Sequence, residues 1–81
     1  MRIKVNFYSY FKELAGCAEV IEEVPAGSTL EALLGCVYQR CPKLHPMRKS
    51  TLTAVGVEYQ DGRYALKEGD EVSLFPPVQG G

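Results

Sequence analysis

The sequence predicts a single-domain α+β fold in which a mixed sheet packs on one main helix. The chain has 81 residues, of which 46% are hydrophobic, and this is too short for two independent cores. Residues 2–8 alternate apolar and polar side chains, the pattern of a half-buried strand. Only residues 28–41 have the spacing of an amphipathic helix of several turns. Because one such helix can cover only one face of a sheet, we expect two layers.

The N-terminal segment predicts two strands joined by a short helical crossing. The alternation in residues 2–8 puts Tyr8 on the face opposite to the apolar set. The inward-facing side chains are expected to be Ile3, Val5 and Phe7. Ser9 is expected to cap one or two helical turns, and Gly16 to end them. Residues 19–24 mix β-branched and acidic side chains, which predicts a partly exposed second strand.

The main helix is predicted by its first residues and by its apolar spacing. Residues 28–31 read Ser-Thr-Leu-Glu, a capping box in which Ser28 would be the N-cap. The apolar side chains that follow at helical spacing are Leu30, Leu33, Leu34, Val37 and Cys41. Pro42 should end the helix, and Gly35 inside it is expected to allow close packing on the sheet.

The C-terminal half predicts the remaining strands. Residues 42–50 are basic, contain two prolines and no acid, and are expected to form a loop without a regular element. Residues 51–59 and 64–66 are expected to be extended, with a turn at 61–62 between them. Residues 71–75 form the last strand, with Val72 and Leu74 inward. This order of elements predicts a β-grasp (ubiquitin-like) roll of four to five strands, with the terminal strands side by side in the middle.

Composition excludes several classes of function. Nine Lys and Arg oppose ten Asp and Glu, so no field exists to attract nucleic acid or anionic lipid. The apolar runs are far shorter than the ~20 residues that cross a bilayer. The three cysteines, Cys17, Cys36 and Cys41, form no CxxC pair, and there is one histidine. We therefore expect a cytoplasmic protein with buried thiols, no metal, no nucleic acid and no membrane partner.

Residues 1–75 supply no self-contained active site. His45 lies in the basic loop without a nucleophile motif, so we expect a solvated side chain. The adjacent acidic pairs, Glu22 with Glu23 and Asp70 with Glu71, would point to opposite faces of a strand and cannot act on one bond. We expect these carboxylates to be solvated.

The C-terminal end is the unusual feature of the chain. We expect residues 1–75 to form the domain and residues 76–81, which read Pro-Pro-Val-Gln-Gly-Gly, to form a flexible tail. Six extended residues reach roughly 20 Å. The prolines restrict the conformations of the tail, and Gly80 and Gly81 lack the Cβ that a narrow slot would exclude. This pattern predicts a tail that delivers the Gly81 carboxylate to the active site of another protein.

The sequence resembles the small, sulfur-carrying subunits of molybdopterin synthase, a ubiquitin-like β-grasp family. The resemblance covers IKVNFYSYFKELAG at 3–16, STLEALL at 28–34 and GDEVSLFPPVQGG at 69–81, and its most specific part is FPPVQGG. It implies that an adenylyltransferase related to ubiquitin activators joins AMP to Gly81, and that sulfur from a donor protein then replaces AMP. The resulting thiocarboxylate would give its sulfur to a pterin precursor in the large synthase subunit during molybdenum cofactor biosynthesis.

The resemblance also implies partners and roles for individual residues. The protein would be a non-catalytic subunit of a heterotetramer and would hold no stable cofactor, only transient AMP and thiocarboxylate sulfur at its end. Gly80 would give the tail access to the partner. The expected partner-binding residues are Tyr8, Tyr59, Phe75, Pro76, Pro77 and Val78: parity puts Tyr8 and Phe75 on the face away from the core, and the resemblance suggests Tyr59.

Three alternatives stay open from the residues. They are a sulfur carrier of another pathway, such as a thiamine-type carrier, a ubiquitin-like modifier that forms an amide with target lysines, and an interaction module with an idle tail. The sequence also departs from the family at Gly56, where relatives usually have Asn. The resemblance does not explain the basic residues between Lys43 and Lys49.

Overall fold

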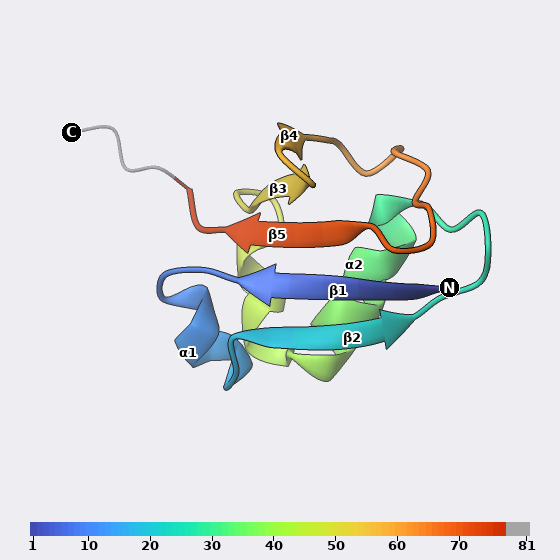
Figure 1. The fold of residues 1–81 in the computed structure, drawn as a ribbon. Coiled ribbons are helices and arrows are strands. Elements are labelled where there is room, and N and C mark those ends of the chain that lie inside the picture. The colour runs from blue at the N-terminus through green and yellow to red at the C-terminus, as the bar shows by residue number, and fades with distance from the viewer. Residues whose placement is uncertain (78–81) are drawn as a thin grey trace.

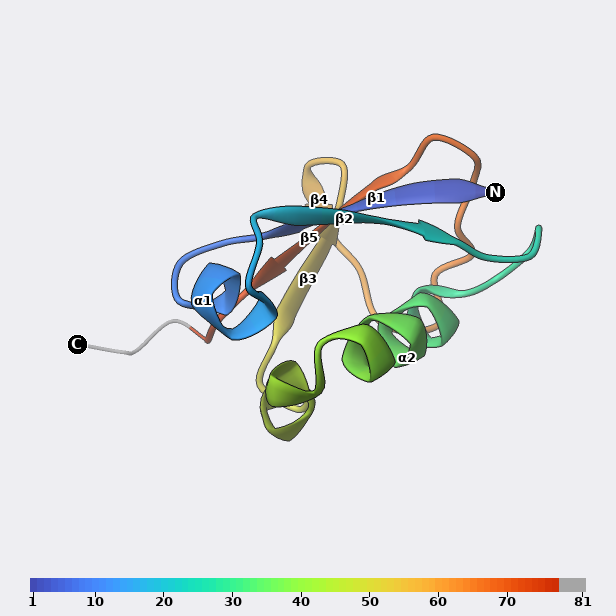
Figure 2. The same ribbon diagram turned by 90° about the horizontal axis from the view of Figure 1, so that it is seen from below.

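The computed structural model describes residues 1–77 and shows a mixed sheet with its helices on one side (Figures 1 and 2). The elements are, in chain order, β1 (Arg2–Phe7), α1 (Phe11–Ala15), β2 (Glu19–Glu23), α2 (Leu30–Arg40), the 3₁₀ helix η1 (Pro42–Met47), β3 (Leu52–Val55), β4 (Glu58–Tyr59) and β5 (Glu71–Phe75). The predicted α+β roll, with one main helix and a five-stranded sheet, is confirmed.

The terminal strands lie side by side at the centre of the sheet, as predicted. The strand order is β2-β1-β5-β3-β4, in which β1 and β5 are parallel and the other pairs are antiparallel. In Figure 1 the carboxyl ends of β1 and β5 lie at the same edge of the sheet, opposite to the N-terminus. Figure 2 shows α1 and α2 below the sheet, so the face above it is open.

The core lies between α2 and the covered face of the sheet. Its fully buried side chains include Ile3, Val5, Phe7, Phe11, Leu30, Leu33, Val37, Leu44, Val72 and Leu74. The inward-facing sets predicted for β1 and β5 are therefore confirmed. Alternation along these strands consequently assigns the remaining side chains to the open face.

The first helix is capped differently from the prediction. Ser9 has a φ of +56°, and the N-cap is Tyr10, which makes no side-chain capping bond. The helix is instead anchored by Phe11, which is fully buried. Gly16 ends it as predicted, with a φ of +78° and its N–H donating to the carbonyl of Lys12.

The main helix begins one residue later than the capping box predicted. Thr29 has extended backbone angles, and its Oγ1 accepts a hydrogen bond from the N–H of Ala32 at 3.3 Å. The Ser28 hydroxyl donates instead to the carbonyl of Pro25 at 2.6 Å. Gly35 is exposed, and an added Cβ would meet no atom within 4 Å, so the predicted close packing at this position is wrong.

The basic segment that was expected to be an irregular loop forms η1. Pro42 stands in the first turn, where its missing N–H and fixed φ are favourable. Leu44 is 1% exposed and anchors the segment in the core. His45 is exposed, as expected, and its ring lies nearly perpendicular to the ring of Tyr38, with 5.8 Å between the centroids.

Residues 51–59, predicted to be extended, form a hairpin. Gly56 and Val57 connect β3 and β4, and the φ of Gly56 is +61°. Glycine is favoured at the first central position of such a two-residue turn, and Asn also tolerates a positive φ, so the turn accounts for Gly56 at this position. The short strand predicted at 64–66 is only an isolated bridge between Ala65 and Thr29.

Two expectations of exposure and burial are wrong. Glu22 points to the helix side and its side chain is 7% exposed; Arg40 donates to it at 2.8 and 3.1 Å. Glu23, its neighbour, lies on the open face, as alternation requires. Cys41 is buried, but Cys36 is exposed on α2, so the thiols are not all buried.

Candidate docking face and C-terminal tail

Strand register gathers apolar side chains on one end of the open face. Leu52 of β3 pairs with Phe75 of β5, and Ala54 pairs with both Tyr59 and Ser73. Tyr8 continues β1 beside β5, and its N–H donates to the carbonyl of Leu74 at 3.2 Å. We call this set the apolar strip; its members are Tyr8, Leu52, Ala54, Tyr59 and Phe75. It crosses four strands and includes three residues that the sequence suggested for partner binding.

The strip is built around an aromatic pair. The rings of Tyr8 and Phe75 stack with centroids 4.7 Å apart and an interplanar angle of 12°. The side chain of Tyr8 remains 41% exposed. The alternation of side chains predicted that both rings lie on the face away from the core. Their direct stacking could not be predicted in this way, because it depends on the parallel pairing of β1 and β5.

The other end of the strip lies on the β3–β4 hairpin. Tyr59 is 70% exposed, and Val57 at the tip of the turn is 99% exposed. Leu52, which sequence analysis did not single out, completes the surface between Tyr59 and Phe75. Leu52 and Ala54 are two residues apart and therefore lie on the same face of β3. The sequence contains this spacing, but it predicts the face of Leu52 only when the position of the following turn is known.

Apart from Ile21 on β2, most of the remainder of the open face is polar, and its charged groups are largely paired with one another. Arg2 lies 3.9 Å from Glu23, and Lys4 lies 3.6 Å from Glu19. Asn6 donates to the Glu71 carboxylate at 2.6 Å. Because these groups already have partners, the apolar strip is the part of this face best suited to cover by another protein.

The strip ends where the tail begins. Phe75 is the last residue of β5, and Pro76 and Pro77 follow it with half-buried side chains. Three residues predicted to function in the tail, Val78, Gly80 and Gly81, lie outside the described residues. β5 is hydrogen-bonded on both sides, to β1 and β3, so the base of the tail is attached to the centre of the sheet.

Within residues 1–77, no group of three His, Cys, Asp or Glu side chains is placed to hold a metal ion. None of the helices in this part of the chain is long and apolar enough to span a membrane. Burial raises the pKa of the Cys41 thiol, which is therefore protonated at neutral pH and a poor nucleophile.

The fold and the open face define a ubiquitin-like β-grasp protein. A solved structure from Pyrococcus furiosus, described as subunit 1 of a molybdopterin converting factor, superimposes with a TM-score of 0.88 at 29% identity, covering 96% of this chain and 99% of that one. The ThiS family model matches residues 5–81. The chain therefore belongs to the ThiS family.

Two similar proteins are subunits of molybdopterin synthase or of molybdopterin-converting factor. The chain is 38% identical, over the whole length of both proteins, to the molybdopterin synthase sulfur carrier subunit of Chlamydomonas reinhardtii. It is also similar to a chain in a solved complex of subunits 1 and 2 of the molybdopterin-converting factor of Helicobacter pylori. That match has 27% identity and a TM-score of 0.73 and covers all of both chains.

Proposed function

We propose that this protein is the sulfur carrier subunit of molybdopterin synthase. The full-length similarity to a named sulfur carrier supports this role. The structural observation that carries it is the position of the apolar strip, which ends at Phe75 where the tail begins. A partner that covers the strip thereby receives the tail next to its own surface.

The chemistry is carried by Gly81. A carboxylate is a poor electrophile, so ATP first converts it to a mixed anhydride with AMP and releases pyrophosphate. The terminal sulfur of a persulfide on a donor protein then attacks the acyl adenylate and releases AMP. A thiol cleaves the resulting acyl disulfide, so that a disulfide forms with the donor sulfur and the terminus is left as a thiocarboxylate. No cofactor is held stably in this scheme, and the thiocarboxylate is the species that donates sulfur to the pterin precursor.

The catalytic side chains belong to the partners in this proposal. The adenylyltransferase binds ATP, and the large synthase subunit binds the pterin precursor. This chain contributes a docking face, a proline-stiffened connection through Pro76 and Pro77, and the reacting terminus. The subunit complex from Helicobacter pylori supports a pairing with the large subunit, for which we infer a heterotetramer.

Intact mass spectrometry tests the carrier role directly. The protein is incubated with the adenylyltransferase, ATP and a sulfur donor, in parallel with a variant that lacks Gly81. We expect replacement of one oxygen by sulfur in the full-length chain only. No mass change with an adenylyltransferase that is active on a known carrier would contradict the proposal.

A second measurement distinguishes the pathway. The thiocarboxylated protein is mixed with the large synthase subunit and the pterin precursor, and formation of molybdopterin is followed. Transfer to a thiamine intermediate, but not to the pterin, would identify a carrier of the other pathway. Amide conjugates to lysine side chains would identify a ubiquitin-like modifier.

A further inference from the structure

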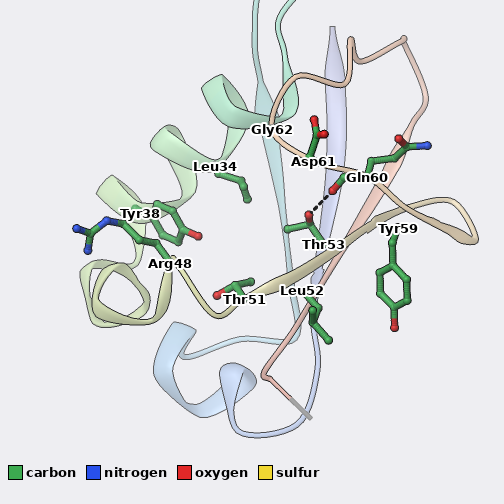
Figure 3. Close-up of a pocket in the computed structure, with 10 residues that line it drawn as sticks. All are labelled: Leu34, Tyr38, Arg48, Thr51, Leu52, Thr53, Tyr59, Gln60, Asp61 and Gly62. Carbon is green, nitrogen blue, oxygen red and sulfur yellow. Dashed lines mark hydrogen bonds between the residues drawn. The ribbon is translucent and has the colours of Figure 1, made fainter.

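Two residues of the apolar strip, Leu52 and Tyr59, also line a pocket of about 550 Å³. Its lining residues are Leu34, Tyr38, Arg48, Thr51, Leu52, Thr53, Tyr59, Gln60, Asp61 and Gly62 (Figure 3). Leu52 and Tyr59 belong to the open face, whereas Leu34 and Tyr38 come from α2 on the other side. A volume of this size accommodates one or two large side chains of a partner.

The pocket lining contains one basic residue, Arg48, and one acidic residue, Asp61, and a basic surface that includes Lys43 and Lys49 adjoins the pocket at Arg48. No acidic residue occurs from residue 32 to residue 57. Lys43, Arg48 and Lys49 are exposed and form no salt bridge with any other residue between 1 and 77. Arg48 donates to the His45 carbonyl at 3.1 Å, which holds its side chain at the pocket. This basic wall, defined as Lys43, Arg48 and Lys49, contrasts with the internally paired charges of the open face.

The pocket also contains an unused polar group. The Tyr38 hydroxyl is buried and has no hydrogen-bond partner among the described residues. Burial raises its pKa, while the nearby Thr51 hydroxyl and the positive charge of Arg48 oppose this change. The neighbouring Thr51 hydroxyl already donates to the Met47 carbonyl at 2.8 Å, so the carboxylate of a ligand would be a stronger acceptor for the Tyr38 O–H than Thr51 is.

We propose that the pocket and the basic wall bind an acidic segment of the large synthase subunit, beyond the contact made on the apolar strip. An apolar side chain of that segment fills the pocket, a carboxylate accepts from Tyr38, and further carboxylates face Arg48 and Lys49. The proposal rests on the proposed function. A protein segment is favoured over nucleic acid because the chain carries a net charge of -1 and the cavity has an apolar wall.

Charge reversal at the basic wall tests this contact. Binding of the large subunit is measured by stopped flow and calorimetry at low and high salt, using Arg48→Glu, Lys49→Glu and the double variant. Lys67→Glu is the matched control, since it makes the same charge change in the turn before β5. We expect the double variant to associate about tenfold more slowly at low salt, with a reduced salt dependence, and the control to bind like the wild type.

Tyr38→Phe tests the pocket itself. It removes one oxygen and leaves the shape of the ring, so circular dichroism should show an intact fold. We expect binding to the large subunit to weaken by about fivefold, a loss typical of one hydrogen bond. Unchanged affinity in Tyr38→Phe, together with Arg48 and Lys49 variants that match Lys67→Glu, would overturn the inference.

The proposed function fails in a different way. If the large subunit does not bind the wild-type chain, both the proposed role in molybdopterin synthase and the inference are wrong. If it binds, and Phe75→Ala weakens binding while the basic wall variants do not, the function stands and only the inference is wrong. Sedimentation of the chain alone that shows self-association lost in Lys49→Glu would identify a second copy as the occupant and would also overturn it.

Discussion

The ring of Tyr8, just beyond the end of β1, lies flat against the ring of Phe75, the last residue of β5, with 4.7 Å between their centroids. The two residues are 67 positions apart in the chain, and they meet because the strands that precede them run parallel. The stack joins the β1–α1 connection to the base of the tail. It therefore presents two partly exposed rings as one fixed surface.

Phe75→Ala should weaken binding to the large synthase subunit. Aromatic residues at the centre of interfaces commonly contribute about 2 kcal/mol or more, which corresponds to about 30-fold in Kd. The fold should persist because Phe75 points away from the core. Calorimetry measures the affinity, and Ile21→Ala, an exposed apolar residue of the same face on β2, is the control. Equal losses for both variants would contradict a role specific to the strip.

Tyr8 and Phe75 should be energetically coupled. A double-mutant cycle with Tyr8→Ala and Phe75→Ala, followed by denaturant unfolding, is expected to give a coupling energy of about 0.5–1.5 kcal/mol. Tyr8→Phe keeps the ring and should retain most of it. Additive effects of the two alanine variants would show that the stack contributes no stability of its own.

Much of the fold was predictable because its signals are local. The strands β1 and β5 each bury one face, so apolar and polar side chains alternate along them. This alternation alone assigned Phe7 to the core and Tyr8 to the open face. The identity of the N-cap was less certain because Ser28 and Thr29 both have hydroxyls, and backbone angles decide between them. The prolines suggested a loop at 42–50, but residues 42–47 form a 3₁₀ helix whose Leu44 is buried in the core. That burial depends on tertiary packing.

The site was predictable in part. Tyr8 and Phe75 were placed by parity, and Tyr59 by resemblance, but Leu52 was missed because the two-residue turn at Gly56 had not been located. That turn pairs Ala54 with Tyr59 and so returns the chain to the same face. The Arg40–Glu22 pair could not be predicted because its members are 18 residues apart and belong to different layers.

Gly62→Ala should destabilise the fold. An added Cβ would lie 3.0 Å from the Cβ of Glu31, and the Gly62 carbonyl accepts from the Glu31 N–H at 2.9 Å. Moving these backbones apart is expected to cost about 1–3 kcal/mol of unfolding free energy. The matched control is Gly35→Ala, which has open space in the middle of α2 and should stabilise by about 0.5–1 kcal/mol. Urea unfolding measures both, and equal signs would contradict the geometry.

Arg40→Met should lower Tm more than the same change at an exposed pair. Glu22 would be left buried at 7% exposure without its two hydrogen bonds from Arg40. Arg63→Met breaks the pair with Asp61, in which both side chains are well exposed, and should have little effect. Adding Glu22→Gln to Arg40→Met should recover part of the loss. Equal Tm values for the two arginine variants would refute the difference.

The stability of the fold should fall in alkaline solution, in part through Tyr38. Its pKa is raised in the folded state by burial, so the folded chain keeps the proton that the unfolded chain loses above about pH 10. The stabilisation is therefore complete below that pH and is lost as pH rises through the folded pKa. Tyr38→Phe removes this titration and should flatten the decline. Urea unfolding between pH 8 and pH 11 measures it, and parallel curves would contradict the assignment.

The central position of β5 also decides how the protein responds to force. A pull on the tail acts along β5, and the hydrogen bonds to β1 and β3 lie across that direction on both sides. Such a load shears many bonds together instead of opening them one at a time. Tension applied at the tail is thus distributed over both halves of the sheet, and a partner can draw on the end of the chain without unravelling the domain behind it.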